Sequence, residues 1–302
     1  MLGLRIDVDT HDGMRDGVPT IRKTLDKYGF RGSFFFSFGP DNSGKAVLRV
    51  FTKPGFVKKM FRTNAASMYG FRTAVSGTFL PARPIAIKFP EIARDCEKSG
   101  HEVGVHAWDH VAWQDHLHQW DYNKTKTEFT KAVNAFTDVF DRKPETCAAP
   151  AWFASELSLQ VQDEYNFEYC SDCRATAEFD GPFLPTWNGT KFHTPQIPAT
   201  IPTLDEDLGR DGRTLDDITK EWLTIAGTRP FAVATIHAEA EGRMYNSWFD
   251  DLCRQMKAAG ASFGPTRDVL FNYIKSGRQM PVREMGLREI PGRAGAVAYT
   301  GA

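Results

Sequence analysis

The chain has 302 residues, of which 41% are hydrophobic and 25% are charged, and its formal net charge is -1. This length is sufficient for one large α/β domain or two small ones. A net charge near zero excludes an evenly basic surface and argues against a nucleic-acid binder. No run of eighteen apolar residues occurs, so we expect no membrane-spanning helix.

The first ten residues, MLGLRIDVDT, are typical of a buried strand and not of a signal peptide, because no charged segment leads into an apolar one. The five cysteines are odd in number and scattered, which favours free thiols in a reducing compartment over a disulfide framework. No second C-x-x-C follows Cys170 and Cys173, so we interpret this pair as incidental. We therefore expect a cytoplasmic protein.

Apolar or aromatic runs alternate with helical patterns along most of the chain. The expected strands cover 3–9, 32–39, 101–108, 229–241 and 261–265, and the expected helices cover 18–30, 89–100, 121–141, 156–166 and 248–259. Repeated strand–helix units predict a parallel sheet with helices outside, either open or closed into a barrel. We expect one domain over residues 1–278 and a loosely ordered tail over 279–302.

A basic and aromatic insert of about residues 42–90 follows the second strand. Nine basic residues and no acidic one lie between Asp41 and Glu91, interleaved with Phe, Met and Val. One interpretation is a solvated helix pair with a buried aromatic face. The alternative, a helical insert that rests on an anionic membrane surface, is favoured because exposed helices usually mix charges of both signs. The residues expected at that surface are Lys53, Phe56, Lys58, Lys59, Phe61 and Arg62.

Two aspartates and two histidines suggest a metal site. Asp7 and Asp9 are two apart at the end of the first strand, where like charges are unfavourable without a cation nearby. His106 and His110 are four apart just after the third strand and share a face if the backbone turns helically there. They could be unrelated polar residues at strand ends, but the two motifs together favour a site for zinc, manganese, cobalt or nickel.

With one aspartate on the metal, the other is free to take a proton from a metal-bound water. His237 ends the last strong strand, and a lone histidine there is usually structural. In a closed barrel, however, its strand approaches the first one, and His237 could then act as general acid for a departing amine. Either Glu239 or Glu241 could orient its imidazole.

D-x-D at the first strand, H-x-x-x-H at the third and I-H at the last together resemble the polysaccharide deacetylase superfamily, over about residues 2–270. These proteins are metal-dependent amide and ester hydrolases on a distorted (β/α) barrel. The resemblance implies that Asp7 is the general base and His237 the general acid. It also implies that Asp9, His106 and His110 are the metal ligands.

The third motif of the superfamily usually carries an arginine that steadies the base. The corresponding stretch here, CAAPAWFAS, has Trp152 but no arginine, so Arg174 in YCSDCR is a candidate to replace it.

Further stretches, including FFFSFGPDNSGK, RTNAASMYG and QIPATIPTLDE, resemble deformylases that act on undecaprenyl-phosphate-linked 4-deoxy-4-formamido-L-arabinose. This resemblance implies formamide hydrolysis at the inner face of a bacterial inner membrane, for lipid A modification and resistance to cationic peptides. Trp108, Trp152, Arg174 and Glu239 are candidates for substrate contact by position. Two alternatives remain: an amidohydrolase for a soluble N-acyl sugar or cyclic amide, and a non-catalytic binding protein for a lipid carrier.

Overall fold

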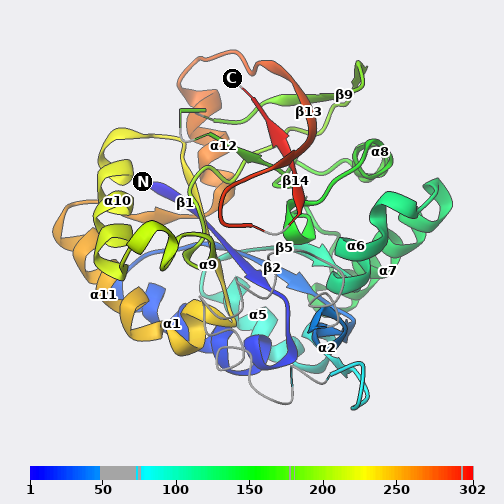
Figure 1. Ribbon diagram of the computed structural model, residues 1–302, viewed down its shortest axis with the longest axis horizontal. Coiled ribbons are helices and arrows are strands. Elements are labelled where there is room, and N and C mark those ends of the chain that lie inside the picture. Colours follow the sequence, from blue (N-terminus) through cyan, green and yellow to red (C-terminus); the bar gives the residue numbers. More distant parts are fainter. Residues whose placement is uncertain (48–72, 74–75, 177, 180, 294, 302) are drawn as a thin grey trace.

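A parallel sheet runs through the centre of the computed structural model (Figure 1), which describes residues 1–47, 73, 76–176, 178–179, 181–293 and 295–301. The strand order is β11-β1-β2-β5-β6-β7, with every pair parallel. The strands are β1 (Leu2–Val8), β2 (Ser33–Ser37), β5 (Glu102–Ala107), β6 (Thr146–Cys147), β7 (Tyr169–Cys170) and β11 (Val233–His237), and β12 (Phe263–Gly264) pairs with the start of β1. β1 and β2 are buried along their whole length, because Leu2, Leu4, Ile6 and Val8 pack against the flanking helices on one face and Arg5 and Asp7 are enclosed by other side chains and loops on the other.

The two edges of this sheet are joined by the irregular segment 195–201. At one edge the Cys170 N–H donates to the Pro195 carbonyl and the Ile197 N–H donates to the Cys170 carbonyl, both at 2.8 Å. At the other edge the Thr200 N–H donates to the Val233 carbonyl at 3.1 Å. The sheet therefore curls into a distorted (β/α) barrel, as predicted.

Helices flank the sheet at the five predicted places, and two further long helices, α10 and α12, were not predicted. The longer ones are α1 (Val18–Tyr28), α5 (Pro90–Lys98), α7 (Tyr122–Phe140), α8 (Glu156–Tyr165), α10 (Leu215–Thr228), α11 (Asn246–Ala258) and α12 (Thr266–Lys275). Asp121 caps the N-terminus of α7, since its carboxylate accepts the Lys124 N–H at 2.8 Å. The short helices and turns of a helix are η1 (Gly13–Gly17), α2 (Ser43–Val47), η3 (Ala86–Lys88), α6 (His110–His116), η4 (Leu117–Gln119), η5 (Pro150–Trp152), α9 (Leu204–Asp207), η6 (Arg210–Gly212) and η7 (Ala240–Met244).

The C-terminal segment forms strands, so the prediction of a loosely ordered tail over 279–302 is wrong. A second sheet has the order β10-β9-β13-β14-β8. Its strands are β8 (Arg174–Ala175), β9 (Leu184–Trp187), β10 (Thr190–Lys191), β13 (Val282–Glu289) and β14 (Ala296–Thr300). Met285 and Ala298 are buried in one apolar cluster with Phe183, just before β9, and Phe192, just after β10. Burial of these few apolar residues against a segment about a hundred positions earlier in the chain orders a sequence that lacks a clear alternating pattern.

Most of the predicted basic and aromatic insert lies outside the described residues. At its ends the structure shows α2, η3 and a two-stranded pair of β3 (Pro40–Asp41) with β4 (Arg83–Pro84). All six residues expected at a membrane surface also lie outside the described residues: Lys53, Phe56, Lys58, Lys59, Phe61 and Arg62. Among the helices that are described, none has the length and apolar character needed to cross a membrane.

Candidate active site

The carboxyl ends of three strands bring the predicted site residues together. Asp7 lies opposite His237 in the β1–β11 pairing, and Asp9 follows directly after β1. His106 lies near the end of β5, and His110 opens the helix α6. In a parallel sheet the carboxyl ends of all strands lie at one edge, which is why residues so distant in sequence meet.

Asp9, His106 and His110 form a group that could hold a metal ion, with their ligand atoms all within 4.8 Å of one another. Asp9 Oδ1 lies 3.2 Å from His106 Nε2, and Asp9 Oδ2 lies 3.3 Å from His110 Nε2. His106 Nδ1 donates to the Ala148 carbonyl at 2.6 Å, so the lone pair of Nε2 faces Asp9.

The electrostatics and hydrogen bonding of this group suit a divalent cation. Asp9 Oδ1 and His106 Nε2 are buried and have no hydrogen-bond partner, a state that is costly unless an ion completes the site. Burial, the largest influence, favours a higher pKa for Asp9, but nearby His110, His106 and His237 outweigh it and lower the pKa. Two imidazole nitrogens and one ionised carboxylate match the ligand preference of zinc and other first-row divalent ions.

Arg5, which the sequence analysis missed, is the residue that holds Asp7. Its Nε and Nη2 donate to the two Asp7 carboxylate oxygens, each at 2.7 Å, and the side chain is fully buried. Two further bonds reach the backbone carbonyls of Ala149, at 3.0 Å, and Ser171. Asp7 Oδ2 lies 4.0 Å from His106 Nε2, so the Arg5–Asp7 pair borders the group that could hold a metal.

Arg174, the predicted replacement for the third-motif arginine, is positioned elsewhere. Its Nη1 donates to Glu206 at 2.9 Å and its Nη2 donates to the Ile201 carbonyl at 3.1 Å.

The sequence did carry a signal for the contact between Arg5 and Asp7. Residues two apart on a strand share a face, so a buried Arg5 had to lie beside Asp7.

The buried Trp152 ring packs against three arginine side chains and against His237. The guanidinium carbons of Arg5, Arg174 and Arg293 lie 5.0, 4.6 and 4.7 Å from its ring centroid. Its ring meets the His237 ring edge-on at 6.4 Å between centroids. Trp152 is only 1% exposed, so it shapes the site from behind. The backbone N–H of Trp152 donates to the Ala149 carbonyl at 3.3 Å.

Glu239 supports the loop that carries Asp9. Its Oε1 accepts the backbone N–H groups of Asp9 at 2.9 Å and Thr10 at 2.7 Å, and the Thr10 hydroxyl at 2.9 Å. Burial, reinforced by the Asp9 charge, raises the pKa of Glu239 to about 8. Although predicted to contact substrate, Glu239 is 1% exposed, and the hydrogen bonds of its Oε1 run to the chain itself.

His237 lies beside the Trp152 ring at the end of β11, and Trp108 follows β5 directly. The Glu241 carboxylate accepts the backbone N–H of His237 at 2.8 Å, which fixes the end of β11. Burial lowers the pKa of His237, but the charges of Asp9, Asp205, Asp7 and Glu241 together raise it. The Trp108 ring is half-buried and packs on Gly39, where a Cβ atom would lie 2.7 Å from the ring.

Cys147, Cys170 and Asp172 form a second close group, but it does not suit a metal ion. All three are buried, and burial raises the pKa of both thiols. The Asp172 carboxylate already accepts the Ala149 N–H at 2.7 Å and the side-chain amides of Gln162 and Gln196. It therefore anchors the turn before Trp152. The five cysteines are free, as predicted.

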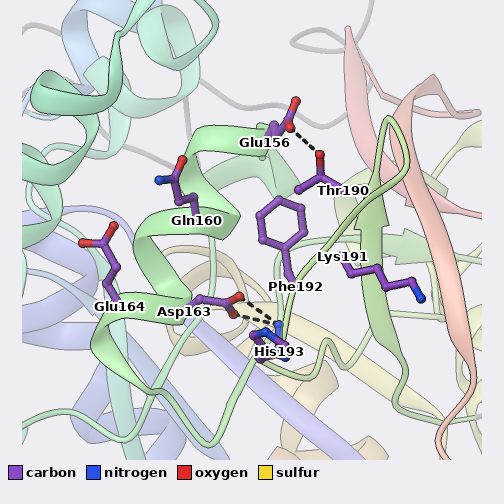
Figure 2. A pocket seen from close by; sticks show the side chains of 8 residues that line it. All are labelled: Glu156, Gln160, Asp163, Glu164, Thr190, Lys191, Phe192 and His193. Carbon is purple, nitrogen blue, oxygen red and sulfur yellow. Dashed lines mark hydrogen bonds between the residues drawn. The ribbon is translucent and has the colours of Figure 1, made fainter.

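A hollow between α8 and the β9–β10 hairpin lies apart from these residues (Figure 2). Asp163 accepts the His193 N–H there at 2.8 Å, and Glu156 accepts the Thr190 hydroxyl at 2.8 Å. Asp163 and Glu156 thus hold the hairpin against α8, and Glu164 bonds Tyr122 and Lys126 of α7. None of the predicted site residues lines it.

Comparisons with known proteins agree with this geometry. The profile of the polysaccharide deacetylase family matches residues 9–170. A protein of Shewanella sediminis (strain HAW-EB3) named "Probable 4-deoxy-4-formamido-L-arabinose-phosphoundecaprenol deformylase ArnD" is 34% identical over 99% of this chain and 94% of its own. A protein of the same name from Wigglesworthia glossinidia brevipalpis is 32% identical over 95% of this chain and 98% of its own.

Solved structures support the fold. One from Mycobacterium smegmatis, assigned as a polysaccharide deacetylase, has a TM-score of 0.60 at 15% identity over 93% of each chain. The peptidoglycan deacetylase PdaC of Bacillus subtilis, solved as a point mutant, has a TM-score of 0.51 at 11% identity over 92% of this chain and 93% of its own. The chain belongs to the polysaccharide deacetylase family and is a hydrolase of carbon–nitrogen amide bonds.

Proposed function

We propose that this protein hydrolyses the formamide of 4-deoxy-4-formamido-L-arabinose carried on undecaprenyl phosphate, giving formate and the free 4-amino sugar. The observation that carries the proposal is the nearly full-length likeness to proteins named for this reaction. The arrangement of Asp7 beside Asp9, His106 and His110 supports it with suitable chemistry. The free amine, once on lipid A, lowers the negative surface charge and so opposes cationic peptides such as polymyxin.

In the proposed site, Asp9, His106 and His110 hold a divalent cation, namely zinc, manganese, cobalt or nickel. When bound, such an ion polarises a carbonyl and makes a water molecule more acidic. The donor set fits because two of its buried atoms have no other hydrogen-bond partner.

Asp7 acts as the general base and takes a proton from the water that attacks the formyl carbon. Arg5 keeps both carboxylate oxygens in place through its two bonds. His237, which nearby carboxylates favour in the protonated form, gives a proton to the nitrogen as the carbon–nitrogen bond breaks. Water thus supplies the hydroxyl group of formic acid, and the sugar keeps an amine.

The lipid-linked substrate implies work at a membrane surface, and we place the protein at the inner face of the inner membrane. The run of nine basic residues without an acidic one between Asp41 and Glu91 supports this, because each basic residue near an anionic surface contributes about 1 kcal/mol.

The test is release of formate from three substrates: the lipid-linked formamido sugar in detergent, a soluble N-acyl sugar and a cyclic amide. The proposal predicts turnover of the first at a kcat/KM well above the others. Preference for a soluble substrate would favour the other amidohydrolase. Binding of the lipid-linked sugar without any formate would favour a non-catalytic lipid-carrier protein.

A further inference from the structure

An apolar turn projects from the structure beside the candidate site. It consists of residues 78–81, Thr-Phe-Leu-Pro, and we call it the apolar tip. Phe79 is 90% exposed and Leu80 is 41% exposed, and Ile87, further along the same segment, is 42% exposed. No charged residue occurs from 76 to 82. Figure 1 shows this cyan segment reaching beyond α2 at the lower right of the view.

The base of the apolar tip is held by hydrogen bonds to the described residues before it. The Ser76 hydroxyl donates to the Asp41 carbonyl at 2.7 Å, and the Gly44 N–H donates to the Ser76 carbonyl at 2.9 Å. Gly77 has φ +77° and its N–H donates to the Leu80 carbonyl at 2.8 Å, which closes the turn. Phe79 is therefore presented outward by an ordered base.

The same segment is tied to the loops that carry the candidate metal ligands. Arg83 Nη1 donates to Asp12 at 2.8 Å, and His11 Nδ1 donates to the Pro84 carbonyl at 2.7 Å. His11 and Asp12 follow Asp9 by two and three positions. Asn42 also donates to Asp109 at 2.7 Å, directly before His110. The apolar tip thus has a fixed place at the rim of the candidate site.

Burial of a phenylalanine side chain against an apolar partner contributes about 1.5 to 3 kcal/mol, so Phe79 offers a substantial gain on binding. The chain around the tip favours an anionic partner, since no acidic residue separates Asp41 from Glu91. Lys45 and Lys88, before and after the tip, are both exposed. An apolar side chain flanked by basic residues matches the chemistry of an anionic phospholipid surface, with a charged headgroup layer above the acyl chains.

We propose that the apolar tip inserts into the headgroup and acyl boundary of an anionic phospholipid bilayer, with Phe79 as its principal anchor. This inference rests on the proposed function, because a polyprenyl-linked sugar reaches the site only if the rim lies at the bilayer. The connection from the tip to His11 and Asp12 would hold the candidate site at a fixed height above the lipid. A segment other than the predicted residues 53–62 would then contribute the first membrane contact.

The test uses the full chain and vesicles of phosphatidylethanolamine with phosphatidylglycerol, without substrate. We expect the native protein to sediment with these vesicles and much less with phosphatidylcholine. F79S should weaken binding about tenfold, from the loss of one buried aromatic side chain. The matched control is F271S, because Phe271 is 51% exposed on α12, at the far end of the molecule in Figure 1. That variant should bind as the native protein does.

Three results would overturn the proposal: no vesicle binding by the native protein, unchanged binding by F79S, or equal weakening by F271S. A dimer in solution that F79S converts to monomer would assign the tip to a second copy instead. Formate assays separate this inference from the proposed function. F79S should lower the ratio of turnover on vesicle-embedded substrate to turnover on a short-chain soluble analogue. Vesicle binding that depends on Phe79 without any formate would leave the membrane contact standing and remove the proposed reaction.

Discussion

Replacement of Arg5 by lysine tests the role of the Arg5–Asp7 pair most sharply. Arg5 makes two bonds to the Asp7 carboxylate and two to backbone carbonyls. Lysine keeps the positive charge but lacks the planar guanidinium group. It can retain one hydrogen bond to Asp7, and about two of the four hydrogen bonds are lost. At about 1.5 to 3 kcal/mol for each bond to a charged group, we expect the free energy of unfolding to fall by about 3 kcal/mol.

The effect on turnover should be larger than stability alone explains. A general base that is misplaced by a fraction of an ångström to about 1 Å costs up to about a hundredfold in rate. We therefore expect R5K to lower kcat by about tenfold to a hundredfold while KM and bound metal per chain stay close to native. The assays are formate release, elemental analysis of the purified protein, and denaturant unfolding.

The control for R5K is R174K. Arg174 is also buried and stacks on the same Trp152 ring, but its carboxylate partner is Glu206. R174K should lose comparable stability with a much smaller loss of kcat. If R5K kept kcat within about twofold of native, or if R174K lost as much, the assignment of Arg5 as the residue that positions Asp7 would be refuted.

The described contacts support three other predictions. Because Glu239 accepts the backbone N–H of Asp9, E239A should weaken the binding of added zinc by about tenfold to a hundredfold, whereas E239Q should bind zinc as the native protein does. The assay is competition with a chelating dye, and equal zinc affinities for the native protein, E239A and E239Q would contradict this role. Burial, opposed by Asp26, lowers the pKa of His101 from 6.5 to about 4. The unfolded chain therefore binds the proton more readily, and up to about 3 kcal/mol of stability should be lost as the pH falls from 6.5 to 4. H101N should flatten this pH dependence in denaturant titrations, and an unchanged slope would exclude His101 as its source. A Cβ atom at Gly17 would lie 2.0 Å from the Ala238 carbonyl oxygen, so G17A should lower the melting temperature by many degrees. The control is G189A, whose Cβ atom would have nothing within 4 Å. Because Gly189 has a φ of +81°, this variant should lower the melting temperature only slightly.

Much of the barrel was predictable because its signals are local. The apolar run of β1, the phenylalanines of β2 and the amphipathic pattern of α7 each fix an element within a few residues. The D-x-D and H-x-x-x-H motifs were also predictable as neighbours, since parallel strands bring their carboxyl ends to one edge.

The remaining features depend on contacts between distant segments. β13 pairs with β9 and β14 pairs with β8, although the paired residues are 98 positions apart in the first case (Val282 and Leu184) and 125 in the second (Tyr299 and Arg174). β13 buries only Met285 and exposes the apolar Val282 and Leu287, so no alternating pattern marks it. Arg174 was a reasonable candidate by position, but whether it reaches Asp7 or Glu206 depends on how the loop between β7 and β9 folds. Only the three-dimensional arrangement distinguishes those partners.

The role of Asp7 as the general base of a metal-dependent deformylase is the step on which the proposed function depends. Its most direct measurement is formate release from formamido-arabinose polyprenyl phosphate by the native protein and by D7N, each measured as purified, after chelation and after metal is restored. With Asp7 in this role, chelation should abolish native activity, restored metal should recover it, and D7N should bind metal normally yet stay about a hundredfold or more slower throughout. Native-like turnover by D7N, or turnover that survives complete chelation, would contradict it.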